Sequence, residues 1–86
     1  MNHELDSVRS VMRRIRDGGE VSVEEVKSLH WEASPELDKL LQKIYRNLMI
    51  FASDDDIRAK DAEYDASWRS SIADLLDELD RRSEPY

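Results

Sequence analysis

Apolar residues recur at spacings of three and four in several separate stretches of this chain, which is the repeat of an amphipathic α-helix. In the first stretch, residues 3–17, one face carries Leu5, Val8, Val11, Met12 and Ile15. Three arginines follow near its end, where cations meet the negative end of the helix dipole. Gly18 and Gly19 come next, and a glycine there can take the left-handed conformation of a C-cap. The pattern therefore predicts a first helix that ends at Gly18.

Two further helices have clear start signals. Ser22, followed three residues later by Glu25, forms a capping box and predicts a short second helix of about two turns from Val23. Ser34 and Pro35 suit the N-cap and the first position of a third helix. This third helix carries the longest apolar face of the chain, so we expect it to be central in the core; the face comprises Leu37, Leu40, Leu41, Ile44, Leu48, Phe51 and Ala52.

A last helix is predicted from Asp65, a candidate N-cap, to about Arg82. Its apolar face comprises Trp68, Ile72, Leu75, Leu76 and Leu79. The connector that precedes it, residues 51–68, holds six carboxylates against two cations and has no Gly or Pro. A connection of this length without turn residues is usually functional or carries some helix of its own.

These elements predict an all-α fold and one domain spanning residues 1–86. The arrangement expected is a small antiparallel four-helix bundle, with a short second helix and an acidic connector before the last helix. A chain of 86 residues has room for one modest core.

The charge narrows the classes of partner. The formal net charge is −7, which disfavours direct binding to nucleic acid or to an anionic membrane and favours encounter with a basic protein. No apolar run approaches the ~18 residues of a membrane span, and there is no signal-peptide pattern at the start. The absence of cysteine excludes disulfides and cysteine-ligated zinc. We expect a cytoplasmic protein.

No pattern in the chain indicates catalysis, a metal or a cofactor. Asp54 and Asp56 invite comparison with a calcium loop, but the fifth position would be Arg58 and the glycine position is Ala59. The histidines have no triad or metal partner at helical spacing. Paired carboxylates need a cleft for acid–base chemistry, and an exposed connector scarcely provides one. We therefore expect a protein that is not an enzyme.

Recognition of another protein is the remaining chemistry. Carboxylates beside aromatic rings can give a basic surface both charge-assisted hydrogen bonds and flat contact area. Phe51 and Trp68 are expected to anchor the ends of the connector in the core. The candidate binding residues are Asp54, Asp55, Asp56, Asp61, Glu63, Tyr64 and Asp65. A merely solvated acidic loop stays open as the alternative.

The segment FASDDDIRAKDAEYDASWRSSIADLLDEL resembles the aromatic, Asp-rich connector and last helix of the colicin D type of small helical immunity proteins, including related proteins of contact-dependent inhibition systems. The resemblance implies binding to the nuclease domain of a toxin made by the same bacterium, often a tRNase, whose basic cleft the immunity protein covers in place of RNA. It reaches Asp54 and Asp56 most directly. It reaches Asp61, Glu63, Tyr64 and Asp65 more loosely, and Asp55 is added for its charge alone. The brief connection between His30 and Pro35 departs from the family layout.

Two other functions fit the same acidic sequence. One is an acidic helical adaptor or regulatory oligomer that binds a basic protein partner. The other is a DNA mimic that acts on a basic DNA-binding protein. A concentration-dependent dimer that buries the first or second helix would favour the adaptor, whereas we expect an immunity protein to be a monomer when free.

Overall fold

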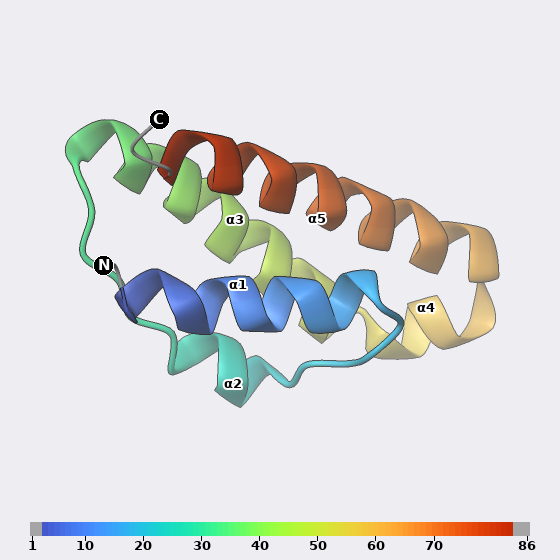
Figure 1. Cartoon of the computed structure of the whole chain (residues 1–86). Coiled ribbons are helices and arrows are strands. Elements are labelled where there is room, and N and C mark those ends of the chain that lie inside the picture. Colours follow the sequence, from blue (N-terminus) through green and yellow to red (C-terminus); the bar gives the residue numbers. More distant parts are fainter. Residues whose placement is uncertain (1–2, 84–86) are drawn as a thin grey trace.

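The structure, a computed structural model, describes residues 3–83. It is helical, without a strand in that range, and confirms the all-α fold (Figure 1). Its helices are α1 (His3–Arg16), α2 (Val23–Lys27), α3 (Pro35–Ser53), α4 (Asp55–Lys60) and α5 (Ala62–Ser83). None of these helices combines the length and hydrophobicity that a bilayer crossing needs.

The helices form a bundle in which the chain reverses direction from α1 to the short α2, from α2 to α3, and from α3 to α5. Figure 1 shows α1 and α3 running one way and α2 and α5 the other. The main contacts of α5 are with α1, α3 and α4, whereas α2 packs on α3. The helix with the most neighbours is thus α5, which corrects the expectation that the third helix would be central. The longest buried face still belongs to α3.

The core is the one that the spacing predicts. The apolar faces of α1, α3 and α5 join in one cluster, which also takes in Val21 and Val26 around the start of α2. Phe51 is fully buried and Trp68 packs half-buried against the cluster, so the two aromatic residues do anchor the connector.

The start and stop signals are mostly confirmed. Gly18 has a φ of 100°, and its N–H donates to the Ile15 carbonyl at 3.2 Å. The Gly19 N–H donates to the Arg14 carbonyl at 2.7 Å, which completes a Schellman motif. The capping box of α2 is present, but α2 has only five residues, shorter than expected. A second turn from Val23 would have reached His30, but His30 is exposed in the non-helical link to α3.

The acidic connector is the main correction to the predicted fold. Asp54 alone separates α3 from α4, and Asp61 alone separates α4 from α5, so the connector is almost entirely helical and the bundle has five helices. Asp61, with an extended backbone, accepts a hydrogen bond from the Tyr64 N–H at 3.1 Å. It caps α5 in place of Asp65, which lies within the first turns of that helix.

Candidate functional site

The α4 end of the bundle is organised around a buried arginine. Arg58 is 4% exposed and is the one buried charged residue in the described part of the chain. Its guanidinium carbon lies 3.5 Å from the centre of the Phe51 ring, and its Nε donates to the Phe51 carbonyl at 3.0 Å. A cation can be buried here because a ring face and a carbonyl at the end of α3 receive it.

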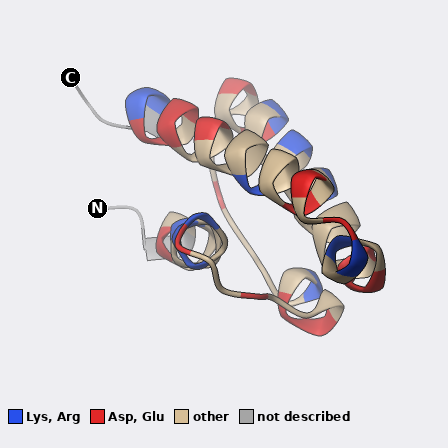
Figure 2. Ribbon diagram, turned by 90° about the vertical axis from the view of Figure 1, so that its right-hand side faces the viewer, with Lys and Arg blue, Asp and Glu red and all other residues tan. Residues whose placement is uncertain are grey.

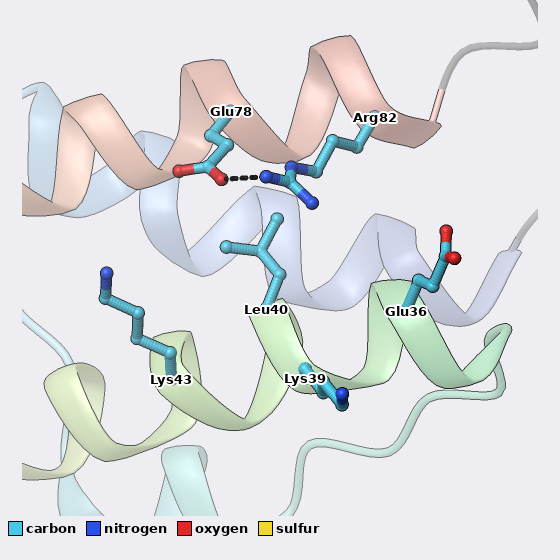
Figure 3. A pocket seen from close by; sticks show the side chains of 6 residues that line it. All are labelled: Glu36, Lys39, Leu40, Lys43, Glu78 and Arg82. Atoms are coloured by element: carbon cyan, nitrogen blue, oxygen red, sulfur yellow. Dashed lines mark ion pairs between the residues drawn. The ribbon is translucent and has the colours of Figure 1, made fainter.

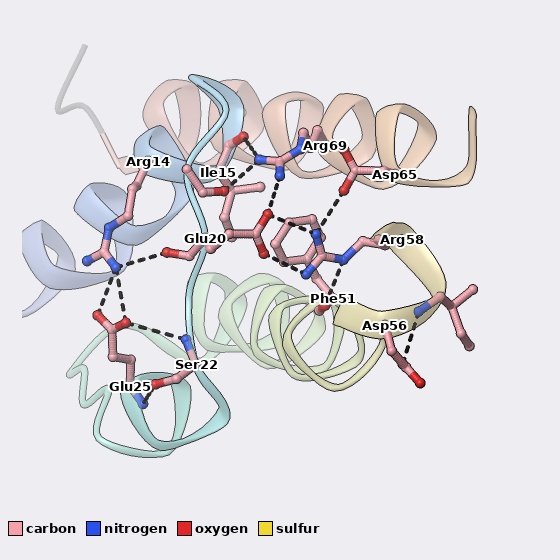
Figure 4. A network of polar contacts seen from close by, with 12 residues as sticks. Arg14, Ile15, Glu20, Ser22, Glu25, Phe51, Asp56, Arg58, Asp65 and Arg69 are labelled. Carbon is pink, nitrogen blue, oxygen red and sulfur yellow. Dashed lines mark hydrogen bonds and ion pairs between the residues drawn. The ribbon is translucent and has the colours of Figure 1, made fainter. Parts of the chain in front are cut away.

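Two carboxylates from distant parts of the sequence neutralise this cation (Figure 4). Glu20, in the link between α1 and α2, accepts from Nη2 of Arg58 at 2.9 Å. Asp65 of α5 accepts from Nη1 of Arg58 at 2.8 Å. Arg58 therefore ties α4 to the α1–α2 link and to α5.

Arg69 completes what we call the arginine cluster: Glu20, Arg58, Asp65 and Arg69. Arg69 contacts both carboxylates, and its Nη1 also donates to the Ile15 carbonyl at 2.8 Å. It thereby holds the C-terminal end of α1. Two cations and two carboxylates leave the cluster neutral, and no buried side-chain nitrogen or oxygen of the described residues lacks a hydrogen-bond partner.

The arginines also shift the protonation of their partners. The pKa of Asp65 lies below its ordinary value because Arg69 and then Arg58 donate hydrogen bonds to the carboxylate. The pKa of Glu20 is lowered in the same way, chiefly by Arg58. Burial opposes both shifts and is outweighed.

The structure divides the seven predicted site residues by where they point. Asp65 belongs to the arginine cluster, and Asp61 caps α5. Tyr64 is half-buried rather than exposed; its hydroxyl donates to Oδ2 of Asp54 at 2.7 Å, a bond that raises the pKa of the phenol. The Tyr64 ring packs edge-on against Trp68. These four residues hold the turn between α4 and α5 together.

The remaining predicted residues face solvent. Asp55, Asp56 and Glu63 are exposed, and Asp56 points away from the arginine cluster (Figure 4). We call Asp54, Asp55, Asp56, Asp61 and Glu63 together the acidic corner; none of them has an ion pair to any residue in the range 3–83. Seen from this end of the bundle, acidic and basic ribbon segments lie side by side (Figure 2).

Two features of this region were not predicted from the sequence. The roles of Glu20, Arg58 and Arg69 depend on contacts between residues tens of positions apart, which no local pattern reports. Ile57 is the other: it is 49% exposed beside the acidic corner, and Ile50 is the other large apolar side chain of the described residues that is exposed. An isoleucine among acids was the available signal for Ile57.

The surface hollows of the described residues are shallow and lined mainly by charged side chains. One groove between α3 and α5 is lined by Glu36, Lys39, Leu40, Lys43, Glu78 and Arg82 (Figure 3). Within residues 3–83 no group of three or more acidic or histidine side chains is arranged to hold a metal ion. Comparison with known protein families, curated proteins and solved structures finds no match to this chain.

Proposed function

We propose that this protein binds and neutralises the nuclease domain of a toxin by laying the acidic corner over that domain's basic cleft. One observation carries the proposal: along the chain, the exposed Ile57 is flanked by five carboxylates that have no ion pair to a described residue, on a corner that the arginine cluster fixes. The proposed protein acts in the cytoplasm, and it acts by binding and not by catalysis.

Rigidity is what makes the acidic corner suitable for recognition. A side chain that is already held in its bound position loses little freedom on association, so more of the contact energy appears as affinity. One-residue joints at Asp54 and Asp61 and the buried Arg58 restrict how α4 can move. The corner can therefore meet its partner as a preformed surface.

Charge and apolar area have separate parts in this contact. The carboxylates attract a basic cleft and raise the association rate, in competition with the phosphates of the cleft's own substrate. Ile57 offers an apolar group that becomes buried on binding. The partner is thus expected to present a cationic rim around an apolar patch.

A nuclease is the partner class that fits best, because its cleft must bind the negative backbone of RNA. The resemblance of residues 51–79 to colicin D-type immunity proteins supports the same class. Among the residues to which that resemblance reaches most directly, Asp54 and Asp56 both lie in the acidic corner.

Inhibition tests the proposal directly. The purified protein is mixed in equal molar amount with the toxic C-terminal domain encoded beside its gene, and RNA cleavage by that domain is followed. We expect cleavage to stop. Full cleavage with no detectable binding would contradict the proposal, and binding without inhibition would restrict it to a role other than active-site blockade.

A further inference from the structure

The face of α3 that points away from the core has an ordered charge pattern. Lys39, Lys43 and Arg46 are exposed on this face before Ile50, and none has an ion pair to any described residue. Ile50, one turn further on, is 46% exposed. In Figure 3, Lys43 extends along the rim of the α3–α5 groove, while Arg82 across it is paired with Glu78 at 2.9 Å. Lys43 is thus available to a partner.

The same face continues past the end of α3. The Asp54 N–H donates to the Ile50 carbonyl at 2.9 Å, and the Arg58 N–H donates to the Asp54 carbonyl at 2.9 Å, so the helical hydrogen-bond ladder runs through the joint. Oδ2 of Asp54 is occupied by Tyr64, which leaves Oδ1 to accept from a cation. Along the chain the order is therefore cations, an apolar residue at the centre, then a carboxylate.

We propose that this face pairs with a second copy of the chain, α3 against α3, in an antiparallel dimer centred on Ile50. A two-fold axis reverses the order of the charges, so the cationic half of each copy meets the acidic end of the other. At a rise of about 1.5 Å per residue, Arg46 lies roughly 6 Å to one side of Ile50 and Asp54 roughly 6 Å to the other. Arg46 of each copy therefore faces Asp54 of the second copy.

The charge order selects a second copy over an unrelated protein. The Arg46–Asp54 pair forms twice in the dimer, and the two Ile50 side chains cover each other, so the two copies present complementary surfaces. Few apolar groups are buried, which makes the dimer a weak one. The expectation of a free monomer then holds for dilute protein.

Dimerisation would also cover Asp54 of the acidic corner. A dimer and a complex with a basic partner would exclude each other at this residue. The inference goes beyond the proposed function, and it is tested on this protein alone, so either can fail without the other.

Sedimentation equilibrium of the full chain, from about 10 µM to about 1 mM, tests the pairing because weak dimers populate within that range. We expect the mass to rise with concentration from 10.1 kDa towards twice that value. Ile50→Asp is expected to stay monomeric throughout, since it would place two carboxylates against each other. Ile50 is exposed, so this variant keeps the fold, which circular dichroism checks.

A charge exchange tests the register. Arg46→Glu and Asp54→Arg should each weaken dimerisation at least fivefold, and the double variant should recover most of it. Lys27→Glu, an exposed cation on α2 outside this face, is the matched control and should dimerise like the native chain. A native mass that is constant at 10.1 kDa up to 1 mM would overturn the inference. A dimer that Ile50→Asp or Arg46→Glu leaves unchanged would overturn it equally.

Discussion

The arginine cluster and the acidic corner lie in the same short stretch of chain, yet their carboxylates meet opposite environments. Asp65 receives hydrogen bonds from two arginines, whereas Asp55, ten residues earlier, is exposed and has no ion pair among the described residues. Both belong to the acidic pattern that marks this segment in the sequence.

The difference shows how the fold assigns separate tasks to one kind of residue. Carboxylates that meet a buried cation fix the helices in place, because an uncompensated Arg58 beneath them would be costly. Carboxylates without such a buried cation are available to pair with cations of a binding partner. In the proposed function, the carboxylates of the acidic corner contact the partner. The carboxylates of the arginine cluster determine the shape of that surface.

Removal of the buried cation should have the largest effect. Arg58→Met leaves Asp65 and Glu20 with Arg69 alone, and we expect a loss of stability towards the lower end of about 3–5 kcal/mol. Lys60→Met removes an exposed cation two residues away and should change stability by less than about 0.5 kcal/mol. Urea denaturation of both variants measures the contrast. Equal midpoints would show that the cluster does not stabilise α4.

Neutralisation of one carboxylate in each region should give a smaller contrast. Asp65→Asn weakens charged hydrogen bonds to two arginines, so we expect a loss of about 1.5–3 kcal/mol. Asp55→Asn, with no such bonds, should stay within about 0.5 kcal/mol of the native chain. The measurement is again the free energy of unfolding. A larger loss for Asp55→Asn would reverse the assignment of the two residues.

Low pH should reduce the difference in stability between the native chain and Asp65→Asn. The pKa values of Asp65 and Glu20 are lower in the folded protein than their ordinary values near 4, so the folded state binds fewer protons than the unfolded state. Their contribution to stability is present above that ordinary range and is lost as the pH falls through the lowered pKa values. The stability difference between the native chain and Asp65→Asn should therefore narrow between neutral pH and about pH 3. A constant difference would contradict this linkage.

The sequence predicted most of the fold because its signals are local. The periodic apolar faces, the Gly18 stop and the Ser22 and Ser34 caps act within one or two turns, and all are present in the structure. The connector was harder, since Asp54, Asp61 and Asp65 are all acceptable caps and only tertiary contact decides among them. Once Asp65 pairs with Arg58 and Arg69, Asp61 becomes the cap of α5.

The candidate site was predictable as a region but not residue by residue. Acidity drew attention to residues 54–65, but it could not separate the carboxylates that face Arg58 from those that face solvent. That separation depends on Glu20, which follows the C-terminal end of α1 after a turn that Gly18 and Gly19 make possible.

Neutralisation of exposed carboxylates in the acidic corner is the first experiment to make, because it tests whether this surface binds the toxin domain. The affinity of the neighbouring toxin domain would be measured by calorimetry for two variants that carry equal net charge. The first is Asp55→Asn, Asp56→Asn and Glu63→Gln in the acidic corner. The second, Asp74→Asn, Asp77→Asn and Glu32→Gln, changes exposed carboxylates on α5 and in the α2–α3 link.

We expect the first variant to lose at least about tenfold in affinity, or about 1.4 kcal/mol, and the second to stay close to the native chain. Both should keep native helix content, since none of these side chains forms an ion pair with another described residue. Equal losses in the two variants would show that net charge alone drives binding and would contradict a specific role for the acidic corner.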